Sequence, residues 1–306
     1  MYNYFLTLLF FCITSPYATA TQHKIHVVAS IRPIHSLVSA VMGDVETPSV
    51  LLEKQQTPHH PTLKPSQIEL LQQADIIFMI EPSFETFLEK PLRSLKPNTQ
   101  IIYLENAPGI VKLPTRTDTK WNNEAHHNHH HHEGTTDGHI WLNPLNGIAM
   151  TQYIADTLSA FDPDRATLYQ ENASNYIKLI QQIDHSIATQ LKPVQKTPFL
   201  VFHDGYQYFE KHFELNGQGA IVFEPDDPLK ASRLQEIEAD IQKQNIECIF
   251  QDTPGNPRII QMIEQNFKIH TAILDPLGVE LTLGPKLYLN LLQNISNQFS
   301  NCLSNH

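Results

Sequence analysis

The stretch DPDRATLYQENASNYIKLIQQIDHSIATQL, residues 162–191, is the most informative part of the sequence for the architecture. It has no glycine and no proline after Pro163, and its apolar residues recur at steps of three and four, which marks one face of a helix. Those residues are Tyr169, Ala173, Tyr176, Ile180, Ile183, Ile187 and Leu191. Asp162 is the expected N-cap, with Pro163 in the first turn. At 1.5 Å per residue such a helix is about 40 Å long.

Strand-like and helix-like segments alternate on both sides of this helix. Before it, the unbroken apolar run Ile76–Ile80 is typical of a strand that is covered on both faces, as in parallel sheets. After it, strands are predicted at Phe199–Phe202, Ala220–Phe223, Glu247–Gln251 and Thr271–Leu274. Such alternation predicts parallel sheets with right-handed crossovers. We therefore predict an α/β protein with two lobes that are joined by one long rigid helix.

The long helix divides the predicted domains. An N-terminal α/β lobe covers residues 21–162, the connecting helix covers 163–192, and a C-terminal α/β lobe covers 193–306. Further helices are expected at Phe84–Leu95 and Pro257–Asn266. The alternative is a long helix that packs wholly inside one domain.

Residues 1–20 are predicted to be a signal peptide. The apolar run Phe5–Ile13 is too short to span a bilayer, and Ala18-Thr19-Ala20 supplies a small-residue cleavage pattern. An N-terminal helix of the fold is the alternative. Cleavage after Ala20 would export the mature chain, so we expect a protein that is soluble outside the cytoplasm or tethered there by a partner.

The composition excludes some partners and favours others. Of the 306 residues, 32 are Asp or Glu and 21 are Lys or Arg, which gives a formal net charge of −11. That balance argues against a nucleic-acid partner, since phosphates need clustered basic residues, and it favours a soluble cation. Histidine is abundant, with 17 residues. The mature chain keeps two cysteines, Cys248 and Cys302, which are expected to pair in an oxidising compartment, the alternative being two buried free thiols.

The segment between residues 121 and 138 is rich in histidine and otherwise polar. Its clustered histidines are His126, His127, His129, His130, His131 and His132. Imidazole suits Zn, Cu and Ni, and a loop that must order itself on binding should hold metal with modest affinity. A solvated loop without a metal role is the alternative. We expect deletion of Asn122–Asp137 to leave a tight site elsewhere nearly intact.

Four residues outside this loop are candidate ligands of a tight site, because each follows a predicted strand or opens a helix. In open α/β sheets, ligands bind beyond the carboxyl ends of the strands. Taken singly, a histidine before a helix is more often a cap or a core residue, and an Asp before proline is more often a turn former. Together they describe three imidazoles and one carboxylate in the groove between the lobes, which suits Zn²⁺. They are His59, His139, His203 and Asp275, and His60 can substitute for a missing ligand.

With these residues in view, the sequence resembles the periplasmic zinc-binding proteins of ABC uptake transporters, the ZnuA type within the cluster A-I solute-binding proteins. The resemblance covers nearly the whole mature chain, and it is the combination of motifs that is specific. The matching segments are Ala29–Pro33, Pro58-His59, Leu63–Ser66, His139–Pro144, Val201–Tyr206, Tyr208-Phe209 and Leu274–Gly278.

The resemblance implies a site and a fold. It implies two lobes joined by a rigid helix, with metal bound between them by His59, His139 and His203. Manganese members tend to carry Glu where His203 stands, so His203 favours zinc, and the acidic His-rich loop and the Cys248–Cys302 pair are also features of zinc members. Asp275 matches a carboxylate that binds metal in manganese members. Pro58 stands where some zinc members have Glu, so the fourth ligand is open among Asp275, water and His60, and Asp275 is favoured.

The function that the resemblance implies is capture of Zn²⁺ in the periplasm. The zinc is delivered to an ABC permease in the inner membrane, which an ATPase subunit drives, and the binding protein is expected to be a monomer and not an enzyme. The chain has no Gly-x-x-x-x-Gly-Lys-Ser/Thr sequence, so it does not hydrolyse ATP itself. The alternatives are a zinc-dependent hydrolase, although no His-Glu-x-x-His helix is present, a binder of manganese or another divalent metal, and a metal-buffering or adhesive surface protein.

Overall fold

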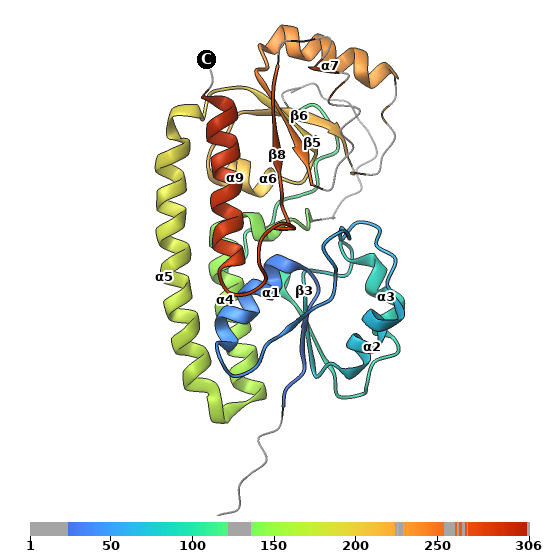
Figure 1. Cartoon of the computed structure of the whole chain (residues 1–306), viewed down its shortest axis with the longest axis vertical. Coiled ribbons are helices and arrows are strands. Elements are labelled where there is room, and N and C mark those ends of the chain that lie inside the picture. Colours follow the sequence, from blue (N-terminus) through green and yellow to red (C-terminus); the bar gives the residue numbers. More distant parts are fainter. Residues whose placement is uncertain are drawn as a thin grey trace, which may run out of the picture.

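Two four-stranded sheets, one in each half of the chain, form the frame of the molecule (Figure 1). The computed structural model describes residues 24–121, 136–223, 231–253 and 269–304, with isolated positions at 225, 229, 261, 263, 264 and 267. The first sheet has the order β2 (Ser49–Val50), β1 (Val27–Ala29), β3 (Ile76–Met79), β4 (Gln100–Tyr103). The second has the order β6 (Gly217–Val222), β5 (Phe199–His203), β7 (Cys248–Asp252), β8 (His270–Leu274). All neighbouring strands are parallel, which confirms the predicted α/β fold.

The central strands are apolar throughout because both of their faces are covered. In β3, Ile76 and Phe78 belong to one core cluster while Ile77 and Met79 belong to another, as the alternation of side chains along a strand requires. In β5 the same rule sends Phe199 and Val201 into the main core, so the next residue of that parity, His203, points to the same side. The strand therefore fixes the direction of a candidate ligand.

Helices flank each sheet. In the first lobe they are α1 (Arg32–Met42), α2 (Pro65–Gln73) and α3 (Glu89–Leu92), and in the second they are α6 (Gln207–His212), α7 (Ala231–Gln244) and α9 (Leu287–Leu303). The expected helix at Phe84–Leu95 is wrong: the segment forms a single 3₁₀ turn, Thr86–Leu88, and then the short α3. Two residues explain this. Pro91 would lie in the interior of the longer helix, and Glu85 accepts backbone hydrogen bonds that hold the preceding turn.

The long helix is α5 (Ala166–Leu191), which forms a hairpin with α4 (Pro144–Phe161). It has 26 residues, and its predicted apolar face is buried, with only Ile183 partly exposed. Asp162 stands at an N-cap position with Pro163 in the first turn, as expected, but it caps a 3₁₀ turn, Pro163–Arg165, that precedes α5, and its side chain makes no capping hydrogen bond. The Asp162 carboxylate instead accepts hydrogen bonds from Arg165 Nη1 at 2.7 Å and from the Tyr169 hydroxyl at 2.9 Å.

The two lobes share one hydrophobic core that runs along α5. This helix packs against α1, α4 and α9, and one core cluster contains residues of both sheets. Polar contacts add to it: Arg32 Nε donates to the Gly278 carbonyl at 3.0 Å, and Ser36 Oγ donates to the Gly284 carbonyl at 2.8 Å. The predicted Cys248–Cys302 disulfide is present and joins β7 to α9. The groove between the lobes is thus bounded by elements that are tied together.

Three expectations fall outside the described residues. They are the signal peptide at residues 1–20, the six clustered histidines between residues 121 and 138, and most of the helix at Pro257–Asn266. Within the part of the chain that the structure covers, no helix has the length and apolar character needed to cross a bilayer.

Candidate metal centre

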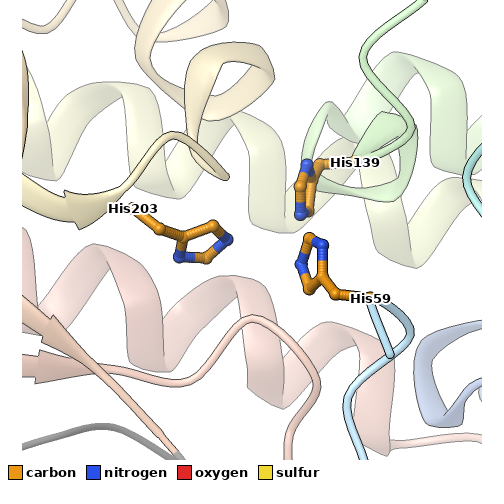
Figure 2. A group of neighbouring side chains, drawn as sticks. All are labelled: His59, His139 and His203. Atoms are coloured by element: carbon orange, nitrogen blue, oxygen red, sulfur yellow. The ribbon is translucent and has the colours of Figure 1, made fainter. Parts of the chain in front are cut away.

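Three imidazoles from separate parts of the chain converge between the lobes (Figure 2). His59 lies in the loop after β2, His139 precedes a 3₁₀ turn at Ile140–Leu142, and His203 is the last residue of β5. Each offers one nitrogen, and these atoms lie within 4.8 Å of one another. The ring centroids are 5.4 to 5.5 Å apart. A divalent ion about 2.0–2.1 Å from each nitrogen fits such a group after small adjustments.

The loop that carries His59 is closed by amide side chains. Gln56 Nε2 donates to the Thr62 carbonyl at 2.8 Å, and Gln67 Nε2 donates to Gln56 Oε1 at 2.8 Å. Gln67 also caps α2, because its Oε1 accepts the Lys64 backbone N–H at 2.8 Å. These bonds give an irregular segment a defined shape. His59 is nevertheless the least buried of the three imidazoles.

An aspartate that the sequence analysis missed orients His203. The Nδ1–H of His203 donates to Asp252 Oδ2 at 2.5 Å, and both side chains are almost fully buried. Asp252 is the last residue of β7, next to β5 in the sheet, so it ends at the same edge as His203. The position of Asp252 directly after the predicted strand Glu247–Gln251 was the signal by which the sequence could have revealed it. With Nδ1 occupied, the nitrogen of His203 that can bind a metal is Nε2.

His139 has the same arrangement with Asp137. Its Nδ1–H donates to Asp137 Oδ1 at 2.8 Å, and the same oxygen accepts the His139 backbone N–H at 3.0 Å. The two contacts fix both the ring and the backbone at this position. Carboxylate partners of this kind orient metal-binding histidines and raise their basicity.

Aromatic rings line one side of the group. Phe84 lies 5.0 Å from the His139 ring and 5.6 Å from the His59 ring, measured between centroids. Trp141 lies 5.3 Å from His139, and its Nε1–H donates to the Pro276 carbonyl at 2.8 Å. Trp141 is fully buried and Phe84 is partly buried, so together they limit the access of water to this side of the imidazoles.

A cavity of about 280 Å³ opens beside His59 and His139, and Phe84 also lines it. Its lining includes the carboxylates Glu81, Asp137 and Asp204, together with His60 and Arg116. Arg116 pairs with Asp204 at 2.6 Å and with Glu210 at 2.8 Å. Burial raises the pKa of Asp204 and raises that of Glu210 to about 7, although the Arg116 charge opposes both changes. The excess of carboxylates suits a cation that enters through this cavity.

Asp275 and His60 do not join the three imidazoles in the described part of the chain. The Asp275 carboxylate, which directly follows β8, accepts the backbone N–H of Leu277 at 3.2 Å. Burial raises its pKa, and backbone hydrogen bonds from its own loop oppose that rise. His60 is exposed and lines the cavity of about 280 Å³. A second cavity of about 20 Å³ lies among the three imidazoles, Asp252 and Leu277, and it is large enough for one water molecule.

A family model and the related sequences agree on one family, and a solved structure shares the fold. The model of the periplasmic zinc-uptake complex component A matches residues 27–302. The high-affinity zinc uptake system protein ZnuA of Brucella suis biovar 1 is 36% identical over 305 residues, covering 91% of each chain. Its namesake from Yersinia pestis is 32% identical over 289 residues, covering 90% of this chain and 91% of the relative. A zinc-bound crystal structure of a ZnuA deletion mutant has a TM-score of 0.78 at 22% identity, covering 93% of this chain and 100% of that one.

Proposed function

Because this chain belongs to the ZnuA family of periplasmic zinc-uptake components, we propose that it captures Zn²⁺ in the periplasm and delivers it to an ABC permease. Its membership confirms the resemblance that the motifs indicated. The related proteins are named as parts of high-affinity zinc uptake systems, and this chain aligns with them over nine-tenths of its length. An ATPase subunit in the cytoplasm would supply the energy for transport.

The observation that carries the proposal is the convergence of His59, His139 and His203 from both lobes. Three neutral imidazoles are a donor set that suits zinc, whereas manganese prefers carboxylate and water oxygens. The donor set therefore favours zinc over manganese as the ion carried.

The fourth ligand that we propose is Asp275. To reach the ion, its carboxylate must exchange the hydrogen bond from the Leu277 backbone for the metal. A negative oxygen would offset part of the charge of the dication, which three neutral imidazoles leave unchanged. Water in the small cavity beside Asp252 is the competing fourth ligand.

Release is proposed to begin at His59. His139 and His203 are buried and held by aspartates, and the lobes are tied together through α5 and the contacts to α1. The His59 loop is irregular and more exposed, so it can move without unpacking the core. Movement of one ligand lowers the affinity of the site while the other two keep their places.

A hydrolase is the less favoured function. Asp204 lies next to His203 and is the nearest candidate for a general base, but its carboxylate is paired with Arg116 at 2.6 Å. A base must be free to take a proton from water, so this ion pair supports transport rather than hydrolysis. We expect the zinc-loaded protein to show no esterase activity above that of free zinc.

Competition with a zinc chelator tests the proposed function. His203→Ala is expected to weaken zinc binding by about 100-fold or more, because it removes a ligand and leaves Asp252 without its imidazole partner. The control is His185→Ala, an exposed histidine on α5 that should leave the affinity unchanged. Equal affinities for wild type and His203→Ala would contradict the proposed site.

A further inference from the structure

Two buried tyrosines lie two residues apart where the chain enters α6. Tyr206 directly precedes the helix and Tyr208 lies in its first turn, and neither side chain is exposed. Side chains at positions i and i+2 point in different directions around a helix, so the two hydroxyls reach different partners. Each hydroxyl binds the aspartate that holds one of the candidate zinc ligands.

The Tyr206 hydroxyl supports His203. It donates to Asp252 Oδ1 at 2.6 Å, while Asp252 Oδ2 accepts the His203 Nδ1–H at 2.5 Å. Both oxygens of Asp252 are therefore committed, and the carboxylate cannot rotate without breaking one of the two bonds. Because all three side chains are buried, water cannot replace a lost bond without entering the core.

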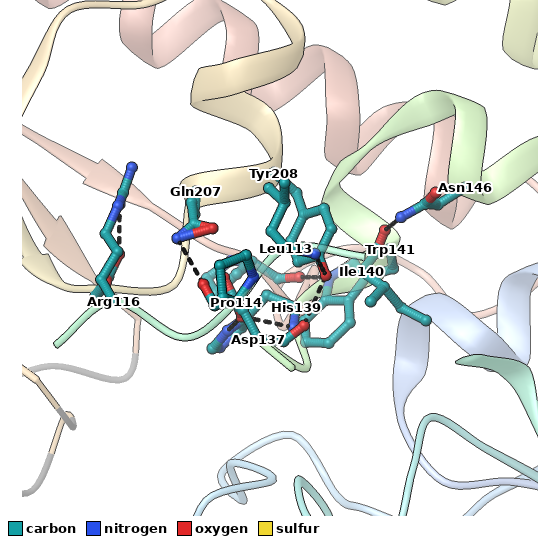
Figure 3. A network of polar contacts seen from close by, with 12 residues as sticks. Leu113, Pro114, Arg116, Asp137, His139, Ile140, Trp141, Asn146, Gln207 and Tyr208 are labelled. Atoms are coloured by element: carbon teal, nitrogen blue, oxygen red, sulfur yellow. Dashed lines mark hydrogen bonds and ion pairs between the residues drawn. The ribbon is translucent and has the colours of Figure 1, made fainter. Parts of the chain in front are cut away.

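The Tyr208 hydroxyl supports His139 (Figure 3). It donates to the Asp137 backbone carbonyl at 2.9 Å and accepts the Leu113 N–H at 2.9 Å. The Asp137 backbone N–H also donates to the Leu113 carbonyl at 2.9 Å. Tyr208 thus holds the residue whose carboxylate accepts the His139 Nδ1–H.

We propose that Tyr206 and Tyr208 are paired positioning residues, each of which orients one zinc ligand through an intervening aspartate. The proposal rests on the proposed function, since it takes His139 and His203 as ligands. One short segment then sets the relative placement of imidazoles that come from different halves of the chain. Neither tyrosine touches the ion.

Phenylalanine variants test the proposal because they remove only the hydroxyls and keep the buried rings. Tyr206→Phe and Tyr208→Phe are each expected to weaken zinc binding about 3- to 10-fold in chelator competition on the full chain. Asp252→Asn should weaken it about 10- to 100-fold. The matched control is Tyr176→Phe, which removes a buried hydroxyl that donates to Pro285 at 2.6 Å, away from the imidazoles, and should leave the affinity unchanged.

Double variants distinguish an orienting role from a general loss of packing. Tyr206 and Asp252 act on the same histidine, so their combined loss should be smaller than the product of the single losses. Tyr206 and Tyr208 act on different histidines, so their losses should multiply. Bound Co²⁺ supplies a second measurement: its visible absorption should change in both single variants and stay as in wild type in Tyr176→Phe.

The outcomes separate this inference from the function on which it rests. The proposal would be overturned if Tyr206→Phe and Tyr208→Phe both had the zinc affinity and the cobalt spectrum of Tyr176→Phe, even if the protein binds zinc tightly. It would also be overturned if zinc affinity fell only in proportion to the melting temperature of the metal-free protein while the cobalt spectra stayed unchanged. If wild type and His203→Ala bind zinc equally, it is the proposed function that fails.

Discussion

Glu85 is a carboxylic acid enclosed in the first lobe, and it makes stability depend on pH. Its Oε2 accepts the backbone N–H of Ile80 at 2.6 Å and that of Glu81 at 3.2 Å. Burial raises its pKa from the ordinary 4.5 to about 7. Between these values the folded protein holds a proton that the unfolded chain releases. The contribution to stability is therefore fully present below pH 4.5 and is lost as the pH rises to about 7.

Glu85→Gln is expected to stabilise the protein at pH 8 and to have little effect at pH 4. At pH 8 the variant avoids a buried charge, and the gain in free energy of unfolding should be on the order of 2–3 kcal/mol. At low pH the wild-type side chain is already neutral. Urea unfolding at both pH values measures the difference, with the exposed Glu89→Gln as control. A gain that is equal at the two pH values would show that ionisation is not its cause.

Asp275→Asn tests the proposed fourth ligand. The amide keeps the size of the side chain and removes its charge, so zinc binding should weaken about tenfold or more if the carboxylate reaches the ion. Chelator competition gives the affinity, and Glu280→Gln, an exposed acidic neighbour, is the control. An Asp275→Asn protein with wild-type affinity would exclude Asp275 and leave water or His60 as the fourth ligand.

At the residue scale, the sequence predicted the imidazoles but not the groups that orient them. His59, His139 and His203 stood out because each follows a strand or opens a helix, and the structure brings them together. Asp252 was overlooked because it ends a strand without a motif, and only the pairing of β7 with β5 places it beside His203. The contact between Asp252 and His203 joins residues 49 positions apart, whereas Asp137 lies only two residues from His139, so only the first pairing depends on the tertiary fold.

At the scale of elements, the ends of the His-rich segment bear directly on the site. Trp121 is held at the edge of the second sheet, where its N–H donates to the Gln218 carbonyl at 3.2 Å. At the other end, Thr136 pairs with Pro114, and the next residue, Asp137, holds His139. A deletion of Asn122–Asp137 would remove the carboxylate that accepts the His139 Nδ1–H, so we revise the expectation that this deletion leaves the tight site nearly intact.

Two deletions separate the histidines from the aspartate. Replacing residues 122–135 by a short Gly/Ser linker should leave the tight affinity within about threefold of wild type, because Asp137 keeps its contact with His139. Extending the deletion through Asp137 should weaken binding about 10- to 100-fold. Chelator competition compares the two variants. A large loss in the shorter deletion would mean that the clustered histidines belong to the tight site.

The disulfide ties α9 to the second sheet. Replacing Cys248 and Cys302 by serine should lower the free energy of unfolding by about 2–4 kcal/mol, chiefly because the unfolded chain gains freedom. Urea unfolding of the variant without reductant, and of wild type with reductant, should give similar midpoints. A variant that unfolds at the wild-type midpoint would show that the bond contributes no stability.

The regular elements were predictable where one pattern ran without interruption. The apolar face of α5 and the buried run of β3 follow from periodicity alone. The segment at Phe84–Leu95 did not become a long helix, because the Glu85 side chain bonds to the preceding backbone and Pro91 breaks the pattern. Tertiary contacts of single side chains decided the local structure there.

At the scale of the whole molecule, a fixed frame surrounds a small site between the lobes. The shared core along α5 and the contacts between α1 and the segment before α9 hold the lobes in place. Within this frame β5 directs His203, the segment after Asp137 directs His139, and an irregular loop presents His59 (Figure 2). The two-lobe architecture was predictable from the long helix and the alternation of elements. The contacts that close the groove were not, since they join residues about 250 positions apart.

Diffraction from a zinc-loaded crystal, collected on both sides of the zinc absorption edge, would show whether the three imidazoles hold the ion. We predict one strong anomalous peak between the lobes, within about 2.0–2.1 Å of a nitrogen of His59, His139 and His203. That peak should disappear in His203→Ala crystals grown with the same zinc. A dominant peak elsewhere on the molecule, with the three imidazoles free of metal, would contradict it.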